Sequence, residues 1–157
     1  GPFMVGAISA VNAVGNVIDP ATQKPVAGMR ATADGTTIVD MEDAMLAAAE
    51  QVTMPLDRTN TTISCIVTNA RLTKAQATKV AQMAADAYAH TIRPTHTSND
   101  GDTIYVLASG LLGAEESPSL PIDLIGLAAT RALEAAIVAG CTESEGAGGL
   151  PAHRDLA

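Results

Sequence analysis

The junction between Asn60 and Thr61 joins a turn-prone stretch to an apolar segment of β type. The sequence reads LDRTNTTISCIVTN from Leu56 to Asn69, so two hydroxyl side chains, Thr61 and Thr62, open the apolar run. A threonine hydroxyl is a weak nucleophile unless a base lies beside it. Cutting the bond before Thr61 would free an α-amine with a pKa of about 8, which can accept the hydroxyl proton. The residues fit a self-cleavage site, although threonines also simply favour strands.

The same three residues satisfy the N-x-T pattern of a glycosylation acceptor. That modification needs a secretory route, and we find no charged segment followed by an apolar stretch of signal-peptide type. We therefore expect a cytoplasmic protein with Cys65 and Cys141 as free thiols. The longest apolar stretches look too short or too interrupted to span a bilayer, so no membrane partner is expected.

A second candidate site is the pair of aspartates in SNDGDTIYVLA, where Asp100 and Asp102 flank Gly101 before an apolar run. Two carboxylates so close at a strand edge can orient an amine, share a proton or pair with a cation. The alternative is an Asp-Gly turn with solvated side chains. A third candidate is Asn12 in AVNAVGN, whose side-chain NH₂ could stabilise an oxyanion. The alternative for Asn12 is a hydrogen bond to local turn backbone.

Hydrophobic periodicity, turn residues and helix caps predict the elements that position these candidates. We expect strands at 4–14 (continued at 17–19), 36–39, 61–68 and 102–108, helices at 41–52, 73–91 and 122–139, and loops at 19–28, 53–60 and 93–101. Asp40 is the expected N-cap of the first helix, and Thr73 with Gln76 forms a capping box for the second. The alternation of strands and helices predicts an α/β layered domain with helices covering a sheet.

Composition narrows the class of protein further. A chain of 157 residues can form one domain with its own core, here filled by aliphatic side chains because it has one Phe, two Tyr and no Trp. A net charge of −8 with nine scattered basic residues argues against nucleic acid as a partner. The three histidines lack the spacing of metal ligands, so no metal is expected.

Three long segments together resemble the C-terminal part of the DmpA-type aminopeptidase family. They are GPFMVGAISAVNAVGNVIDPATQKPVAG, NTTISCIVTNARLTKAQATKVAQMAADAYA and RPTHTSNDGDTIYVLASG. The family includes β-peptidyl aminopeptidases and nylon-oligomer (6-aminohexanoate oligomer) hydrolases. The resemblance covers residues 1 to about 140 in order, and NARLTKAQ and DGDT look closer to the threonine-dependent nylon-oligomer branch.

The resemblance implies an N-terminal-nucleophile hydrolase with an αββα sandwich, of which this chain is a part. Family precursors cut themselves, so residues 1–60 would end the α chain and residues 61–157 would form the β chain of one structural domain. Thr61 then matches the nucleophile and α-amine base, Asn12 the oxyanion residue, and Asp100 and Asp102 the orienting pair. No cofactor is implied. The implied partners are the upstream α-chain portion, which carries a basic or tyrosine residue of the site, and further copies of the protein.

The function expected on this basis is hydrolysis of linear amide oligomers through an acyl-enzyme on Thr61. Alternatives are an aminopeptidase that acts on short peptides and an inactive oligomerisation or binding domain. A self-cut acyltransferase of the ornithine acetyltransferase kind is a further alternative, but its PNMATML-like surroundings are not found.

Overall fold

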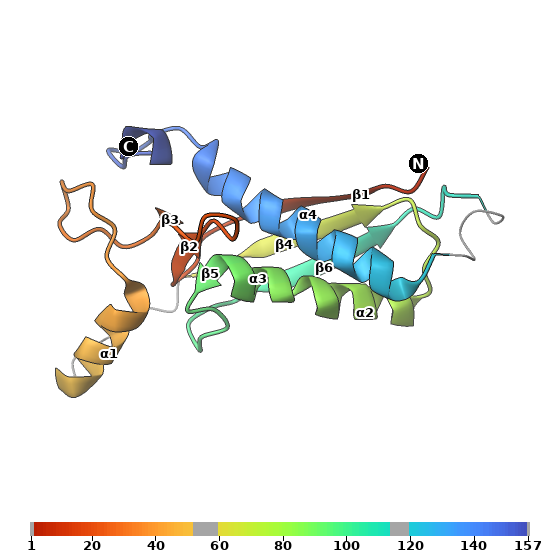
Figure 1. Ribbon diagram of the computed structural model, residues 1–157, viewed down its shortest axis with the longest axis horizontal. Coiled ribbons are helices and arrows are strands. Elements are labelled where there is room, and N and C mark those ends of the chain that lie inside the picture. Colours follow the sequence, from red (N-terminus) through yellow and green to blue (C-terminus); the bar gives the residue numbers. More distant parts are fainter. Residues whose placement is uncertain (1, 52–59, 114–119, 157) are drawn as a thin grey trace.

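The computed structural model describes residues 2–51, 60–113 and 120–156. Its main sheet has three strands in the order β1-β4-β6, with bounds β1 Val5–Ala10, β4 Ile63–Thr68 and β6 Thr103–Ala108. β1 runs antiparallel to β4, and β6 runs parallel to β4 (Figure 1). Strands that are distant in sequence are therefore neighbours, and β4 lies in the centre of the sheet.

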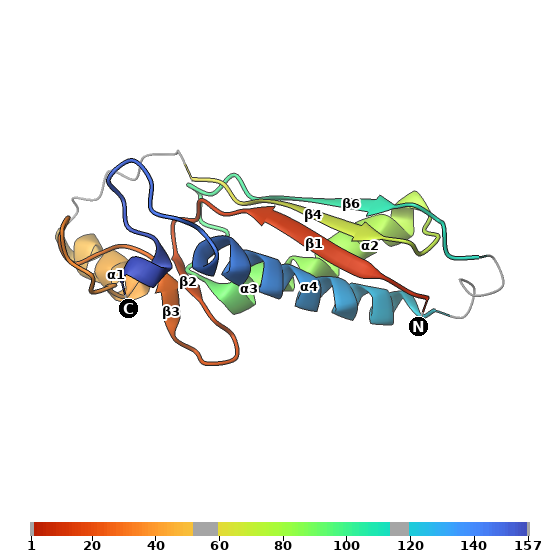
Figure 2. The ribbon, with the colours of Figure 1, turned by 90° about the horizontal axis from the view of Figure 1, so that it is seen from above.

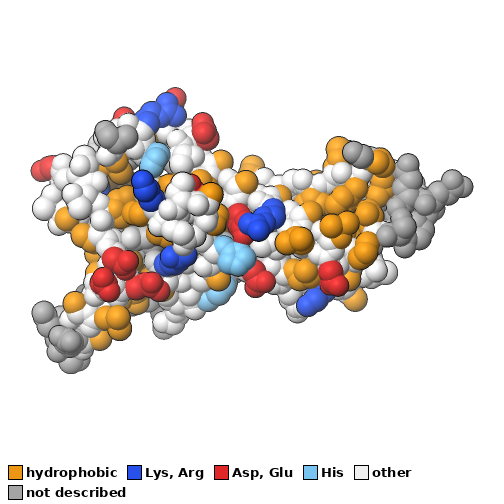
Figure 3. Space-filling view, viewed as in Figure 1, with side chains coloured by type: hydrophobic (Ala, Val, Ile, Leu, Met, Phe, Trp, Pro, Cys, Tyr) orange, Lys and Arg blue, Asp and Glu red, His pale blue; other side chains and the backbone are white. Residues whose placement is uncertain are grey.

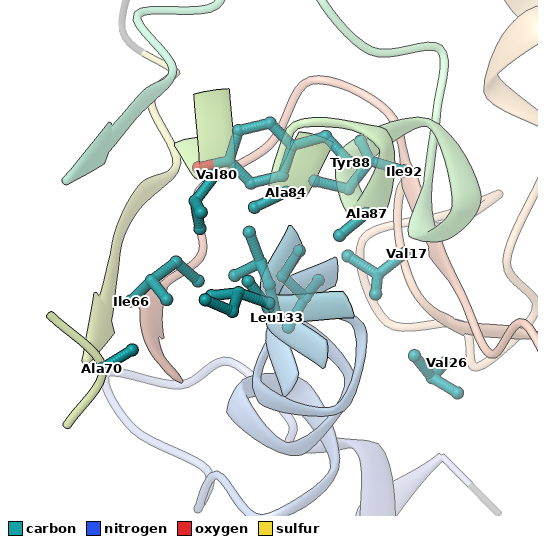
Figure 4. Close-up of a cluster of buried hydrophobic side chains, with 13 residues drawn as sticks. Val17, Val26, Ile66, Ala70, Val80, Ala84, Ala87, Tyr88, Ile92 and Leu133 are labelled. Atoms are coloured by element: carbon teal, nitrogen blue, oxygen red, sulfur yellow. The ribbon is translucent and has the colours of Figure 1, made fainter. Parts of the chain in front are cut away.

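Three helices cover one face of the main sheet: α2 Lys74–Ala84, α3 Asp86–Thr91 and α4 Ile122–Thr142. Figure 2 shows them on one side of β1, β4 and β6. The core between the layers is aliphatic apart from Tyr88, and Figure 4 shows Ile66 of β4, Val80 of α2 and Leu133 of α4 pointing into it. This is the predicted layered α/β architecture, and it is consistent with an N-terminal-nucleophile hydrolase-like fold.

The opposite face of the main sheet is apolar and open among the described residues. Ile8 of β1 is 70% exposed, and Tyr105 and Leu107 of β6 are each 59% exposed. Ile63 and Val67 of β4 share this face because strand side chains alternate between the two faces. Among the described residues, helices therefore cover only one face of the main sheet.

A second, smaller sheet has the order β3-β2-β5, with bounds β2 Asn16–Ile18, β3 Pro25–Ala27 and β5 Ile92–Arg93. The predicted continuation of the first strand at 17–19 is wrong, because these residues pair with β3 and β5 instead of with β4. The chain turns at Gly15, where an added Cβ would overlap with the carbonyl oxygen of Pro94. The predicted loop at 19–28 contains β3, and the predicted strand at 36–39 is reduced to one bridge between Arg30 and Ile38.

The helix caps follow the sequence prediction. Asp40 Oδ1 accepts the backbone N–H groups of Glu42 (2.9 Å) and Asp43 (3.1 Å) at the start of α1 Met41–Gln51. The capping box of Thr73 and Gln76 is present at the start of α2. These caps could be predicted because they depend only on residues two or three positions apart.

The single helix predicted at 73–91 is in fact two, α2 and α3, joined at Ala85. The N–H of Ala85 donates to the carbonyl of Ala81, four residues back, whereas the N–H of Tyr88 donates to Ala85, three residues back. The tighter turn interrupts the α-helical ladder. Ala84, Ala87 and Tyr88 form an apolar stripe with helical spacing, which predicts a buried face. Tyr88 is indeed buried, despite the break.

α4 is longer than predicted and ends at Thr142. It has 21 residues, and an 18-residue stretch within it has a mean hydropathy of 1.6. By length and composition alone it is therefore long and apolar enough to cross a membrane, and no other helix of the described segments is. By length and composition alone, the expectation that the apolar stretches are too short or too interrupted to span a bilayer does not hold for this helix. Its buried side belongs to the core, whereas Leu124 and Leu127 are exposed where apolar side chains gather over the start of α4 (Figure 3).

Candidate active site

The candidate residues meet at one edge of the main sheet. Asn12 follows the end of β1, Thr61 precedes the start of β4, and Asp100 and Asp102 precede the start of β6. Because β1 is antiparallel to β4 and β6 is parallel to it, these three chain segments lie at the same edge. The topology thus brings together residues that are about 40 to 90 positions apart in the sequence.

Thr61 is fixed by hydrogen bonds on both sides of the junction. Its backbone N–H donates to the carbonyl oxygen of Asn12 at 2.8 Å. Its Oγ1 donates to the carbonyl oxygen of Asn60 at 2.6 Å, which places the hydroxyl against the peptide group that would be cut. Asn60 is held in turn by its Nδ2, which donates to the carbonyl oxygen of Ala13 at 3.2 Å. The regular strand begins only at Ile63, two residues later than predicted.

Asp102 lies in a buried setting beside the junction, with its side chain only 9% exposed. Its Oδ1 accepts the backbone N–H of Thr62 at 2.8 Å, and its Oδ2 lies 4.0 Å from Nδ1 of His96. Burial raises the pKa of Asp102 above its ordinary value, and the negative charge of Asp100 acts in the same direction. The Thr62 hydrogen bond and His96 oppose that pKa shift only in part.

Asp100 has a different environment, although it is only two residues away. Its Oδ2 accepts both the N–H (2.9 Å) and the Oγ1 hydroxyl (2.8 Å) of Thr97, and its Oδ1 accepts the N–H of Val14 at 3.3 Å. This carboxylate therefore ties the loop before β6 to the segment after β1. The simple Asp-Gly turn with solvated side chains does not describe either aspartate.

A polar group that the sequence interpretation missed lies beneath the strand starts. The hydroxyl of Tyr88 contacts Ser64 Oγ at 2.8 Å and donates to the carbonyl oxygens of Thr62 (3.2 Å) and Thr103 (3.3 Å). Ser64 Oγ is also 2.8 Å from Ser9 Oγ. Burial raises the pKa of Tyr88, so its hydroxyl stays protonated and supports the two strands. The signal that could have found it is a serine at an inward-facing position of a buried strand.

The two threonines of the junction differ in their surroundings. Thr62 is fully buried, and its Oγ1 has no hydrogen-bond partner among the described residues. Its carbonyl oxygen accepts the N–H of Thr103 at 3.0 Å, the first rung between β4 and β6. Thr61 is half-buried and carries the contacts to the Asn60 carbonyl.

Metal ligands do not assemble in the described segments, where no three His, Cys, Asp or Glu side chains come together. Cys65 and Cys141 are both free thiols, as predicted. The arrangement at the sheet edge is a hydroxyl, a peptide carbonyl and two carboxylates in unequal environments. Such a set can carry out acyl transfer by groups of the protein itself.

The class of protein follows from comparison with known sequences. The model of peptidase family S58 matches residues 1–154, and the chain belongs to this family. This is the family that the sequence resembles.

Particular relatives make the comparison more specific. The chain is 36% identical over 166 residues to an uncharacterized aminopeptidase of Mycobacterium tuberculosis, which covers 97% of the chain and 47% of the relative. It is 34% identical over 158 residues to an uncharacterized aminopeptidase of Mycobacterium leprae, covering 95% and 43%. It is 30% identical over 118 residues to a 6-aminohexanoate-oligomer endohydrolase of Paenarthrobacter ureafaciens, covering 75% and 33%. The chain thus spans less than half the length of these relatives.

Proposed function

We propose that this chain is the catalytic C-terminal part of a self-cleaving amide hydrolase with Thr61 as its nucleophile. The observation that carries the proposal is the position of the Thr61 hydroxyl, 2.6 Å from the carbonyl oxygen of the peptide bond that precedes it. The residues up to Asn60 would then end the α chain, and Thr61 would begin the β chain. Membership of peptidase family S58 supports a hydrolase.

The proposed turnover uses the freed α-amine of Thr61 as the base. The amine accepts the hydroxyl proton, and Oγ1 attacks the substrate carbonyl. The side chain of Asn12 stabilises the resulting oxyanion, and Asp100 and Asp102 keep the amine in position. The amine proton passes to the leaving nitrogen, and water then hydrolyses the ester on Thr61. In the uncut chain the Thr61 N–H already donates to the Asn12 carbonyl, which supports the proximity of these two residues.

The proposed substrates are short amide chains with a free ammonium end, because two carboxylates lie at the site. Linear amide oligomers and short peptides both meet this description. Amide oligomers are the first candidate from the motifs NARLTKAQ and DGDT. Short peptides are the second, and the higher identity and fuller coverage of the relatives named aminopeptidases favour them.

The upstream part of the protein is the proposed partner of the open sheet face. The relatives are more than twice as long as the matched segment. Ile8, Tyr105 and Leu107 are exposed on this apolar face, which is typical of a surface that another part of a protein covers. We therefore assign to the upstream part the second sheet of an αββα sandwich and the remaining residues of the site. Assembly into homo-oligomers is also part of the proposal.

The test is intact-mass spectrometry of the full protein, followed by assays with an aminohexanoate oligomer and a short peptide side by side. A β chain whose mass begins at Thr61, together with release of amine from one substrate, supports the proposal. A protein that stays whole and consumes neither substrate is instead an inactive binding domain. Consumption of acetylornithine alone would indicate the acyltransferase alternative.

A further inference from the structure

The carbonyl oxygen of Asn60 accepts a second hydrogen bond besides the one from Thr61. The backbone N–H of Gly101 donates to it at 3.0 Å, within an isolated parallel bridge between Asn60 and Asp100. The N–H of Gly101 therefore points at the oxygen of the very peptide bond that self-cleavage would break. No function is assigned to this amide by the reaction described above.

In self-cleavage the Asn60 carbonyl oxygen is the atom that gains negative charge. Attack by Thr61 Oγ1 on the Asn60 carbonyl carbon turns this oxygen into an oxyanion, and a donor already aimed at it lowers the barrier. We propose that the Gly101 N–H is the oxyanion donor for self-cleavage at Asn60–Thr61, and that residue 101 must be glycine to leave room for the attacking hydroxyl. This inference rests on the proposed function.

The step balances without any further reactant except water. The Oγ1–C bond forms, the C–N bond between Asn60 and Thr61 breaks, and the proton lost by Oγ1 ends on the nitrogen of Thr61. Water then hydrolyses the ester, which leaves a carboxylate on Asn60 and a free hydroxyl and amine on Thr61. The Gly101 N–H acts on the oxygen throughout and transfers no proton itself.

The need for glycine comes from space and not from backbone conformation. The residues described with φ in the left-handed region include Gly110 but not Gly101. A Cβ added to Gly101 would lie 2.7 Å from Thr61 Oγ1 and 3.6 Å from its Cγ2. Relief of that contact by rotation of the Thr61 side chain would take the hydroxyl away from the Asn60 carbonyl. A side chain at residue 101 should therefore impair the reaction far more than the fold.

The decisive experiment removes the single N–H group. Cell-free translation of the full protein can replace Gly101 with glycolic acid, which exchanges the amide N–H for an ester oxygen. The matched control replaces Thr103 with its α-hydroxy analogue, because the Thr103 N–H donates at the same 3.0 Å to Thr62, whose carbonyl is not cut. We expect cleavage at Thr61, as measured by mass spectrometry, to be about 10²- to 10³-fold slower in the variant at residue 101. The control should cleave at nearly the wild-type rate.

The outcomes separate this inference from the proposed function. A wild-type protein that cleaves, with an ester variant at 101 that cleaves equally fast, overturns the inference and leaves the proposed function standing. Equal slowing in the variants at 101 and 103 also overturns it, since the effect would then be one of strand pairing. A wild-type protein that never shows a Thr61 terminus overturns both.

A second comparison tests the requirement for space. Gly101→Ala keeps the N–H but adds the Cβ, and Gly35→Ala is its control, because a Cβ there also meets a threonine hydroxyl, 2.5 Å away on Thr32. We expect Gly101→Ala to slow cleavage by at least about tenfold, through loss of the attack geometry. Gly35→Ala should cleave normally. Cleavage of Gly101→Ala at the wild-type rate would overturn the requirement for glycine.

Discussion

The two ends of strand β4 carry similar residues in opposite order, and the structure uses them differently. The strand begins after Asn60-Thr61-Thr62, and it ends at Thr68, which Asn69 follows. At the finish, Asn69 Oδ1 accepts the N–H of Met4 at 2.8 Å and its Nδ2 donates to the carbonyl of Pro2 at 2.6 Å. Thr68 Oγ1 donates to the carbonyl of Met4 at 2.8 Å. These contacts close the ladder between β1 and β4.

At the start of β4, by contrast, the threonine hydroxyl is directed at the peptide bond that precedes it. Two carboxylates lie beside it, and burial raises the pKa of one of them. The residue types alone do not separate a strand closure from a reactive junction. The two ends of β4 differ in the segments that lie beside them. The start of β1 lies beside the end of β4, whereas the loop before β6 brings Asp100 and Asp102 to the start of β4.

The largest expected effect comes from exchanging the two adjacent threonines for a residue of the same shape. Thr61→Val should lower self-cleavage and turnover by about 10⁴-fold or more, because it removes the nucleophile. Thr62→Val is the control, since the buried hydroxyl of Thr62 has no described hydrogen-bond partner. Intact mass and substrate assays measure both variants. Normal cleavage in Thr61→Val would remove the functional contrast between the two ends of β4.

Asp102→Asn should lower turnover by about 10²-fold, in the range that misplacement of a reacting group costs, because Asp102 keeps the Thr61 amine in position. The unfolding free energy of the Asp102→Asn protein, in contrast, should not fall. The folded-state pKa of Asp102 lies above the ordinary value of 3.8, so ionisation of this carboxyl costs stability as the pH rises from about 4 through the raised pKa. At pH 7 the Asn variant should be at least as stable as the wild type, because it avoids that cost.

Denaturant unfolding at pH 4 and pH 7 checks this stability prediction. Asp100→Asn is the comparison, because both oxygens of Asp100 accept hydrogen bonds from Val14 and Thr97 and one acceptor would be lost. We expect it to lose about 1–2 kcal/mol of unfolding free energy. An Asp102→Asn protein destabilised as much as Asp100→Asn would show that the two carboxylates have the same structural role.

The pH dependence of turnover in the cleaved protein should report the titration of the free α-amine of Thr61, which precedes β4. The α-amine of Thr61 must be neutral to accept the hydroxyl proton. We therefore expect kcat/KM to rise about tenfold per pH unit below the amine pKa of about 8 and to level off above it. Steady-state rates between pH 5.5 and 9 measure this rise. A rate that stays flat across that range would exclude the amine as the base.

The smallest effect on activity is expected at the finish of β4. Asn69→Ala removes two hydrogen bonds to the backbone of Pro2 and Met4, and should cost about 1–2 kcal/mol of unfolding free energy. Self-cleavage and kcat should stay within about twofold of wild type, because the lost contacts lie at the far end of the strand. A large loss of activity in a stably folded Asn69→Ala protein would show that the two ends are coupled.

Local features of the structure could be predicted from the sequence with good accuracy. Short-range spacing was enough to predict the caps at Asp40 and Thr73, the buried stripe that includes Tyr88, and the strand that ends at Ala108. The break of the helix at Ala85 could not be predicted, because alanine carries no signal for a tighter turn. The second sheet was missed for a similar reason, since strands of two or three residues are too short to show a period.

The sequence by itself determined which residue types stand at the junction and which family the chain resembles. It also determined the order of the main helices and strands, because periodicity and caps arise from interactions a few residues apart. Only the tertiary structure decided that the Gly101 N–H points at the Asn60 carbonyl and that Asp102 is buried while Asp100 ties two loops together. These facts depend on strand order and register, which the packing of the whole sheet against α2 and α4 fixes.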